Sequence, residues 1–371
     1  MEIRVDSAEL FRSVSRLQSI IERKSNMPIL STILFSATGS NLLISATDLE
    51  LSFQETLAAE VLEEGSTTIS GRKLFEILKE TRSDKLYLKE KENNRIHISD
   101  EITRFDLACI AADEFPALVE PEGMPTIQMD GAILSEMVNK TIYAVTLEEA
   151  GFKLSGVFTE RLTHDGEDLL RMVATDGHRL SMIDKPIFGL DSLNMEKGVM
   201  IPKKGMSELN KLASQGGTVE IGFGQKTCVA RRENMLLVMR LLEAKFPDYN
   251  AIIPARESKP MVIARSSLLE AMRKMLILSN ERYRAVKITL ENNVLDLIST
   301  NPDLGEAQEQ IKIEYNGERV EAGFNPKYFI ETLQAMESDV IGLEFSDSKK
   351  PCIIRGDADK GFLGLIMPMR V

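Results

Sequence analysis

The chain has 371 residues, of which 43% are hydrophobic, and its 57 Asp and Glu outnumber its 45 Lys and Arg, which gives a formal net charge of −12. A chain of this length exceeds one ordinary hydrophobic core and is too apolar to be disordered, so two or three domains are expected. The acidic balance argues against a polyanionic partner, because nucleic-acid binders usually carry an excess of basic residues.

The cysteines and the amino terminus indicate the compartment. Cys109, Cys228 and Cys352 lie far apart, which is typical of reduced thiols and unlike a disulfide framework. The first residues, MEIRVDSAEL, alternate apolar and polar side chains and have no signal region, and no apolar run approaches the length of a membrane span. The sequence therefore predicts a cytoplasmic protein with no membrane contact.

Helical patterns recur along the chain. The first segment begins with Asp6 and Glu9 at capping-box spacing, and the fifth contains Ser267 and Glu270 at the same spacing. Amphipathic or capped segments predict six helices, over 7–24, 71–85, 132–145, 203–211, 265–278 and 326–336. Alternating segments around Asn93-Asn94 and around Asn292-Asn293 predict β-hairpins.

Three segments resemble one another: NLLISATD at 41–48, LLRMVATD at 169–176 and VLDLISTN at 294–301. Their spacing is close to one third of the chain, and a helix pattern precedes and follows each, which indicates tandem repeats. Proline-containing stretches around 116–125 and 247–260 read as linkers. We therefore expect three α+β repeats, over 1–121, 126–247 and 248–371, each with two helices on antiparallel sheet.

Motifs that carry chemistry are scarce. The segment GFGQKT at 222–227 lacks the glycine that a phosphate loop has before its Lys-Thr pair, and neither GxSxG nor GxGxxG occurs. None of His97, His164 and His178 has a cysteine or histidine at metal-ligand spacing. The sequence predicts no metal site, no cofactor and no catalytic residue.

Two segments nevertheless stand out. The turn ATDGHRL at 174–180 gathers Thr, Asp, Gly, His and Arg, and it is either a functional turn or an Asp-Gly turn whose His and Arg cap backbone carbonyls. The end of the chain, GFLGLIMPMRV at 361–371, is apolar where termini are usually polar. It can be a final docked strand, a Met-rich wall of a groove, or both.

The three repeats, together with VATDGHRL, FPDY at 246–249, MPILSTIL at 27–34 and MPMR at 367–370, closely resemble the bacterial DNA sliding clamps, the beta subunits of the replicative DNA polymerase III holoenzyme. The resemblance spans the whole chain. It implies a DNA-clamp fold and a head-to-tail homodimeric ring with helices lining the hole and antiparallel sheets outside. Such a ring encircles double-stranded DNA without sequence preference and acts as a processivity factor with no catalytic step.

The resemblance also implies partners and a site for them. The replicative polymerase catalytic subunit, the clamp-loader complex, and repair and ligation proteins would compete through short peptides for one pocket. That pocket comprises Leu154, Thr175, Gly177, His178, Arg179, Leu180, Pro247, Ile252, Leu365, Met367, Pro368, Met369 and Arg370. Asn250-Ala251 follows FPDY where a typical member has a second basic residue, which alters the polar rim.

Two further sets of residues follow from the resemblance. The DNA contacts would be Lys24, Phe152, Lys153 and Lys204. The seam of the ring would bring Phe105 of one copy to Ile277 and Leu278 of the other, flanked by basic residues that face acidic ones. These flanking residues are Lys73, Arg95 and Arg104 on one side and Asp303, Glu306 and Glu309 on the other.

Two other functions compete with this interpretation. An enzyme could use His178 as a general base beside Asp176 for hydrolysis or group transfer, although a mostly apolar pocket offers a substrate little polar contact. A repeat scaffold could bind proteins only, and it would then show no salt-dependent association with DNA.

The distribution of charge removes the objection raised by the net value. The six predicted helical segments together carry +8 over 81 residues, which leaves −20 on the other 290. Helices that line a hole would therefore present a modest basic surface to DNA, while an acidic exterior would discourage DNA from binding outside.

Overall fold

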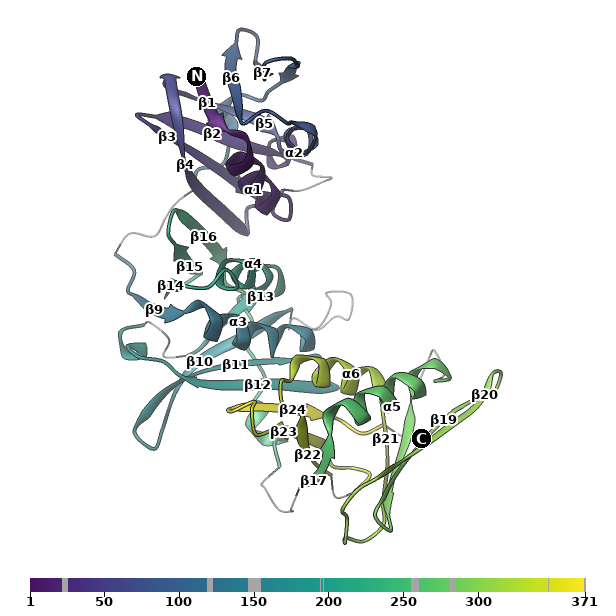
Figure 1. Cartoon of the computed structure of the whole chain (residues 1–371). Helices are drawn as coiled ribbons and strands as arrows, with labels where there is room; N and C mark the ends of the chain where they lie inside the picture. Colours follow the sequence, from purple (N-terminus) through teal and green to yellow (C-terminus); the bar gives the residue numbers. More distant parts are fainter. Residues whose placement is uncertain are drawn as a thin grey trace. The chain divides into compact units, whose positions relative to one another are not determined.

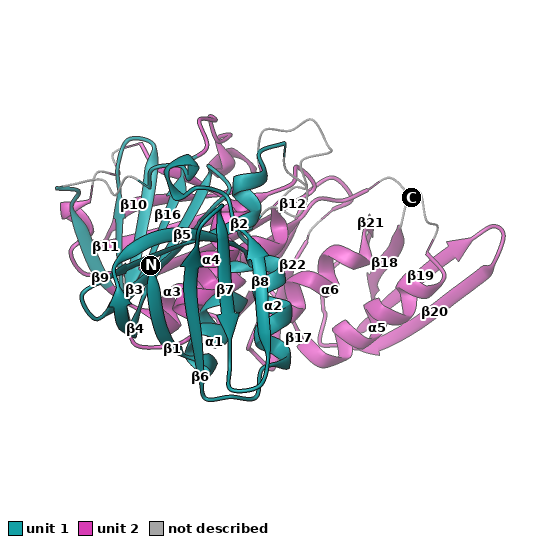
Figure 2. Ribbon diagram, turned by 90° about the horizontal axis from the view of Figure 1, so that it is seen from above, with its two compact units in different colours: residues 1–128, 218–241 teal, residues 129–217, 242–371 magenta. Residues whose placement is uncertain are grey.

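The computed structural model describes residues 1–21, 26–118, 123–145, 155–193, 195, 197–254, 260–279, 285–345 and 347–369. The chain forms two compact units, which are coloured separately in Figure 2. Unit 1 contains residues 1–128 and 218–241, and unit 2 contains residues 129–217 and 242–371. Each unit is described by itself below.

The described residues contain six α-helices, and consecutive helices pack against each other in pairs, α1 with α2, α3 with α4 and α5 with α6. Figure 1 shows the pairs along the chain. The helices are α1 (Ser7–Leu17), α2 (Gly71–Glu80), α3 (Gly131–Asn139), α4 (Lys203–Ala213), α5 (Arg265–Ile277) and α6 (Pro326–Ala335).

Unit 1 is built on a twelve-stranded sheet. Its longest strand, β4, pairs with β1 and β3 of the same repeat and also with β16, so the sheet continues from the first sequence repeat into the second. The strands are β1 (Glu2–Asp6), β2 (Thr32–Thr38), β3 (Asn41–Thr47), β4 (Leu51–Glu63), β5 (Gly65–Ser70), β6 (Lys85–Lys91), β7 (Arg95–Ser99), β8 (Arg104–Ala108), β9 (Thr126–Asp130), β14 (Thr218–Phe223), β15 (Thr227–Arg232) and β16 (Met235–Arg240).

The described residues of unit 2 form two sheets. The eight-stranded sheet joins repeats in the same way, because β12 of the second repeat pairs with β24 of the third, and α3 and α6 pack against these two strands. Its order is β13 (Val199–Pro202), β10 (Gly156–His164), β11 (Glu167–Thr175), β12 (Arg179–Pro186), β24 (Phe362–Ile366), β23 (Cys352–Gly356), β22 (Val340–Glu344) and β17 (Met261–Ala264). The four-stranded sheet has the order β20 (Gly305–Lys312), β19 (Val294–Asn301), β18 (Val286–Glu291) and β21 (Val320–Phe324).

The predicted hairpins and the final strand are confirmed. Asn93, Asn94, Asn292 and Asn293 all have positive φ, between 53° and 64°, a conformation that asparagine tolerates. Asn292-Asn293 is a two-residue loop between the paired Glu291 and Val294, as a type I′ turn requires, whereas three residues, Glu92 to Asn94, separate the paired Lys91 and Arg95. The apolar end of the chain forms β24, which lies between β12 and β23 in the middle of the eight-stranded sheet.

Several predicted helix boundaries are wrong. The first helix ends at Leu17 and not at residue 24, and α2 ends at Glu80 and not at residue 85. The segment predicted as 132–145 contains α3 only to Asn139, followed by a short 3₁₀ turn over Ile142–Ala144. The Thr141 hydroxyl donates to the carbonyl oxygens of Met137 and Val138, and this side-chain capping accompanies the end of the helix.

One of the two predicted N-caps is present and the other is not. The Asp6 carboxylate accepts from the backbone N–H of Glu9 at 2.8 Å, as the spacing predicted. In α5 the helix already begins at Arg265, after Ala264, which has no side-chain acceptor. Ser267 therefore lies inside the first turn and does not cap the helix.

Candidate partner-binding site

An apolar cluster in unit 2 joins the second and third repeats. Leu180 on β12 and Leu365 on β24 are opposite each other in the sheet, and both are buried. Met367 packs against the cluster from the chain end. The buried members are Val173, Leu180, Met182, Met200, Phe246, Tyr249, Ile353, Leu363 and Leu365. Four segments that are distant in sequence thus meet at this point.

The FPDY segment closes one side of the cluster with aromatic rings. The Phe246 ring stacks on Phe158 with centroids 4.9 Å apart, and Tyr249 lies edge-on to Phe246. The Tyr249 hydroxyl accepts from Arg171, whose guanidinium binds Asp184 with two hydrogen bonds of 2.6 Å. Burial raises the pKa of Tyr249 to about 12, so this residue stays a neutral phenol at physiological pH.

The turn between β11 and β12 is held by its own polar side chains. The Thr175 hydroxyl donates to the carbonyl oxygen of Arg179 at 2.6 Å and accepts from the Gly177 N–H. One oxygen of Asp176 accepts from the N–H groups of His178 and Arg179, both at 3.0 Å. Gly177 has φ of +85°, which favours glycine. The turn is therefore rigid at the edge of the apolar cluster.

The corresponding turn in the first repeat has the same hydrogen bonds. The Thr47 hydroxyl donates to the carbonyl oxygen of Leu51 and accepts from the Leu49 N–H, while Asp48 accepts from the N–H groups of Glu50 and Leu51. Leu49 has φ of +75°, where the second repeat has Gly177. The first two repeats thus share this turn, whereas the His-Arg pair occurs only in the second.

Arg179 is buried behind the turn, among groups from three elements. Its guanidinium donates to Asp176 at 3.0 Å, to the carbonyl oxygen of Tyr143 at 2.6 Å and to the Glu331 carboxylate. The rings of Tyr143 and Tyr328 lie 5.2 and 4.8 Å from its guanidinium carbon, at cation–π distance. The sequence left open that His178 and Arg179 cap backbone carbonyls. Arg179 does so, because it binds the carbonyl of Tyr143.

The chain end lies beside strand β21. The Met367 N–H donates to the carbonyl oxygen of His178 at 2.8 Å, and the Met369 N–H donates to that of Gly323 at 2.7 Å. A depression of about 680 Å³ opens there, lined by Glu321, Ala322, Gly323, Ser348, Lys349, Met367, Pro368 and Met369. The three chain-end residues are all half-buried and line this depression.

The structure brings most of the predicted pocket residues together. Thr175, Gly177, His178, Arg179 and Leu180 form the turn, while Leu365, Met367, Pro368 and Met369 form the adjoining strand and chain end. Pro247 and Ile252 are exposed next to Phe246 and Ile253, which pack in the cluster. Leu154 and Arg370 lie outside the described residues.

The alternative of an enzyme with a His178–Asp176 dyad finds no support in this geometry. Both Asp176 oxygens are engaged, one by the N–H groups of the turn and the other by Arg179. The exposed His178 ring stacks parallel to Tyr328, with centroids 6.4 Å apart, and within the described residues it has no hydrogen bond to Asp176. A general base needs an orienting partner, and this imidazole has none in the described part of the chain.

Of the predicted DNA contacts, only one can be placed. Lys204 lies exposed in the first turn of α4. Its neighbour Lys203 is half-buried and donates to the carbonyl oxygen of Val145, and burial together with the charge of Arg179 lowers the pKa of Lys203. Lys24, Phe152 and Lys153 lie outside the described residues.

The predicted seam residues lie on two sheet edges and the helices beside them. Within the described part of the chain, β8 pairs only with β7, and β20 pairs only with β19. Phe105 is 36% exposed on β8, and Ile277 is 74% exposed at the end of α5, followed by the half-buried Leu278. An exposed edge strand with apolar neighbours is available for pairing with another chain.

The charged seam residues already have some internal partners. Lys73 binds Glu76 on its own helix at 2.8 Å, and Lys274 of α5 binds Glu309 at 2.9 Å. Arg95 and Arg104 are exposed on the β7–β8 hairpin, and Asp303 and Glu306 are exposed at the β19–β20 turn and on β20. The predicted charged seam residues are therefore basic on the β8 side and acidic on the β20 side, and β8 also carries the exposed Asp106.

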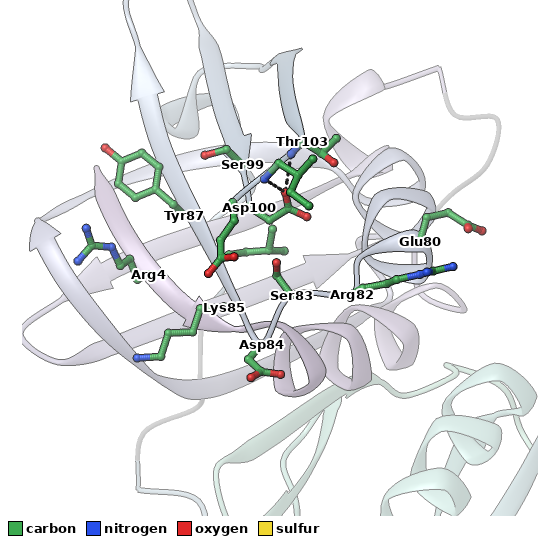
Figure 3. A pocket seen from close by; sticks show the side chains of 13 residues that line it. Arg4, Glu80, Arg82, Ser83, Asp84, Lys85, Tyr87, Ser99, Asp100 and Thr103 are labelled. Atoms are coloured by element: carbon green, nitrogen blue, oxygen red, sulfur yellow. Dashed lines mark hydrogen bonds between the residues drawn. The ribbon is translucent and has the colours of Figure 1, made fainter.

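A second depression, of about 790 Å³, lies in unit 1 beside the β7–β8 turn (Figure 3). Its walls carry side chains of both charges, including Arg4, Lys85 and Asp84. The Asp100 carboxylate accepts from the N–H groups of Ile102 and Thr103 and so closes the turn. None of the predicted site residues lines this depression.

Within the described residues, no group of three or more His, Cys, Asp or Glu side chains is placed to hold a metal ion. None of the helices found in the described segments is long and apolar enough to span a membrane.

Several residues of the site were missed in the sequence. Phe158, Tyr143, Tyr328 and Glu331 surround the turn and the cluster, but each lies in an ordinary strand, turn or helix pattern. Tyr328 and Glu331 are three residues apart and so share a face of α6, which was the one available signal. Nothing in the sequence indicated that this face meets Arg179.

Family models match the whole chain in order. Residues 1–119 match the amino-terminal domain of the DNA polymerase III beta subunit, residues 128–248 match its central domain, and residues 250–370 match its carboxy-terminal domain. These three matches follow the three repeats seen in the sequence.

Individual proteins are similar over the same length. The beta sliding clamp of Pseudomonas aeruginosa is 30% identical over 375 residues, covering 100% of both chains, and that of Caulobacter vibrioides is 29% identical with the same coverage. Among solved structures, a sliding clamp of Bartonella birtlesii bound to griselimycin has a TM-score of 0.94 at 30% identity, and the Caulobacter crescentus polymerase III beta has 0.93 at 28%. Each covers 100% of both chains.

Proposed function

The chain belongs to the DNA polymerase III beta subunit family, and on this premise we propose that two copies close head to tail into a ring that slides on double-stranded DNA. It is a sliding clamp, a non-catalytic processivity factor of the replicative polymerase. We assign its three repeats to residues 1–121, 126–247 and 248–371, and its location to the cytoplasm.

The observation that best supports a ring is the pair of complementary sheet edges, β8 and β20. Strand β8 ends the sheet of unit 1 with exposed Phe105 between Arg104 and Asp106 and near the basic Arg95, while β20 ends the four-stranded sheet with the acidic Glu306 and Glu309. Backbone pairing of β8 with β20 of a second copy would satisfy both edges, and Ile277 and Leu278 would then cover Phe105. The ion pairs at the rim would favour this orientation over a like-with-like arrangement.

The apolar cluster beside the 175–180 turn supports a peptide-binding role. Leu242, Ile253 and Met367 are half-buried against the cluster that contains Leu180 and Leu365, so they offer apolar surface at its edge, and Met is well suited to accept different side chains. A short extended peptide with hydrophobic anchors would dock there, as peptides do when a few buried residues supply most of the affinity. Through such peptides the polymerase, the loader, and repair and ligation proteins would compete for one clamp.

The rim of this pocket departs from the family pattern at Asn250-Ala251. Both residues are exposed in the short 3₁₀ turn Tyr249–Ile252, and the Asn250 N–H donates to Asp248. A neutral amide at this position would attract an acidic flank of the peptide less than a basic residue would. We therefore expect weaker dependence of peptide affinity on salt than in a clamp with a basic rim.

The decisive experiment is topological. The clamp, placed by its loader on nicked circular DNA, should stay bound through gel filtration and should be lost once the circle is linearised. Equal retention on circular and linear DNA would mean ordinary binding and would refute the ring. Sedimentation at micromolar concentration adds a second check, because a strictly monomeric chain cannot close a two-subunit ring.

The scaffold alternative makes a different prediction. A repeat protein that binds only other proteins would show no DNA association at any ionic strength, whereas a clamp with a basic inner face should show weak association that falls with added salt. Direct titration of DNA at 50 and 200 mM salt separates the two.

A further inference from the structure

Arg179 links the proposed pocket to the third repeat. It directly precedes Leu180 of the apolar cluster, while its guanidinium donates to the Glu331 carboxylate on α6. The Tyr328 ring, one helical turn before Glu331, lies 4.8 Å from the guanidinium carbon. Helix α6 therefore contacts the pocket turn directly, through Glu331 and Tyr328.

The contact is made where solvent screening is weak. The Arg179 side chain is only 8% exposed, and Glu331 is 28% exposed. A charge-assisted hydrogen bond in such surroundings is stronger than a surface ion pair, and loss of the acceptor leaves a buried guanidinium incompletely paired. The remaining acceptors are Asp176 and the Tyr143 carbonyl, which both belong to the second repeat.

The backbone of Arg179 and His178 carries this contact to the chain end. The Thr175 hydroxyl donates to the carbonyl oxygen of Arg179, and the Met367 N–H donates to that of His178. Movement of the Arg179 side chain would therefore disturb the backbone that fixes Met367 at the cluster. The chain of contacts runs from α6 through the turn to Met367.

We propose that Glu331 is a positioning residue of the peptide pocket, which acts through Arg179 and does not touch the peptide. It holds the 175–180 turn and Met367 in the arrangement that receives the hydrophobic anchors. This inference rests on the proposed peptide-binding function.

Lys327 provides a matched control on the same helix. Its amine lies 3.7 Å from the other Glu331 oxygen, and its side chain is 49% exposed. An exposed pair at this distance contributes little. Lys327→Gln changes the charge of α6 by one unit, in the opposite direction to Glu331→Gln, and it leaves the contact between Glu331 and Arg179 in place.

The experiment measures binding of a fluorescent peptide of the QLxLF pattern to the full chain by anisotropy. Glu331→Gln keeps the shape of the side chain and removes its charge. It should raise the dissociation constant of the peptide by about fivefold. Lys327→Gln should stay within about twofold of the parent. In Glu331→Gln, hydrogen exchange should become faster in segments 176–180 and 362–369, where the Met367 bond lies.

The outcomes separate this inference from the proposed function. If the parent chain does not bind the peptide, the pocket assignment fails. If the parent binds and Glu331→Gln binds equally well, the positioning role alone is refuted. Equal weakening by Lys327→Gln, which keeps the Arg179 contact, would show that the loss of affinity does not come from that contact. Weakening by Glu331→Gln without faster exchange in the two segments would show that Glu331 does not act through the turn. Each result overturns the proposal.

Discussion

The most deeply buried charges in unit 2 join the second and third repeats. The amine of Lys140, at the carboxy-terminal end of α3, lies 2.7 Å from carboxylate oxygens of both Glu136 and Asp359. Asp359 also accepts from the N–H groups of Glu337 and Ser338 and from the Ser338 hydroxyl. Every partner in this group is itself hydrogen-bonded, which is the condition under which buried ions are tolerated.

Asp359→Asn should therefore destabilise unit 2 by about 3 kcal/mol, because it leaves Lys140 buried with one carboxylate in place of two. Thermal or urea unfolding of the variant measures the loss. Asp357→Asn, an identical change at an exposed position two residues away, should cost less than about 0.5 kcal/mol. Equal stability of the two variants would mean that the buried pair contributes nothing.

The same group predicts a pH dependence. Burial alone would raise the pKa of Asp359, but hydrogen bonds from Lys140 and Ser338 outweigh it and lower the pKa below the ordinary 3.8. A carboxyl whose pKa is lower in the folded state stabilises the protein above its unfolded pKa and loses that contribution as the pH falls through the folded one. Between pH 5 and about 3, the parent should lose more stability than Asp359→Asn, and parallel curves would contradict this assignment.

At the scale of elements, the turn between β23 and β24 depends on one close approach. Gly361 has φ of +82°, and a Cβ added there would lie 2.1 Å from the backbone oxygen of Asp184. Its carbonyl oxygen accepts from the Asp184 N–H, so the two backbones are in direct contact. This contact fixes the beginning of β24, the strand that carries Leu365 into the cluster.

Gly361→Ala should cost about 3 kcal/mol, because it combines an unfavourable backbone conformation with a clash against the backbone. Gly166→Ala is the matched control, since Gly166 in the same unit has φ of +81° and no atom within 4 Å of the added Cβ. That variant should cost only about 1 kcal/mol. Chemical denaturation of both proteins measures the difference, and equal losses would leave no role for the contact with Asp184.

Turns and helix caps could be predicted from the sequence where side chains close in sequence determine the backbone conformation. The Asn-Asn turns and the Asp6 cap follow from the residues themselves, because one or two side chains determine the backbone there. Ser267 shows the limit, since its spacing suits a cap but the helix begins two residues earlier. The contact between Glu331 and Arg179 spans 152 residues, and no local pattern encodes a contact that only the fold creates.

At the scale of the whole molecule, the charge argument survives the corrected helix boundaries. The six helices of the structure contain twelve Lys and Arg against seven Asp and Glu, a net charge of +5 on 64 residues, while the chain carries −12. The excess is smaller than the +8 expected from the longer predicted segments, but its sign is unchanged. A modest positive inner face suits a sliding contact, because each phosphate is held weakly.

The closed ring depends on the seam, so a single apolar residue there should control assembly. Ile277 is 74% exposed, which means that a polar substitution costs the isolated subunit little. Ile277→Asp would place a charge against Phe105 of the other copy and beside the acidic β20 edge. We expect the dissociation constant of the dimer to rise by roughly 30-fold, which is the effect of losing an interface hot spot.

Phe188→Asp is the control for this prediction, because Phe188 is 97% exposed in the same unit and lies outside the proposed seam. Sedimentation over a range of concentrations should show the parent and Phe188→Asp as dimers where Ile277→Asp is monomeric. Only the seam variant should then be lost from circular DNA, since an open or monomeric clamp has no topological hold. An Ile277→Asp protein that dimerises like the parent would place the seam elsewhere, and one that is monomeric yet retained on circles would separate retention from ring closure.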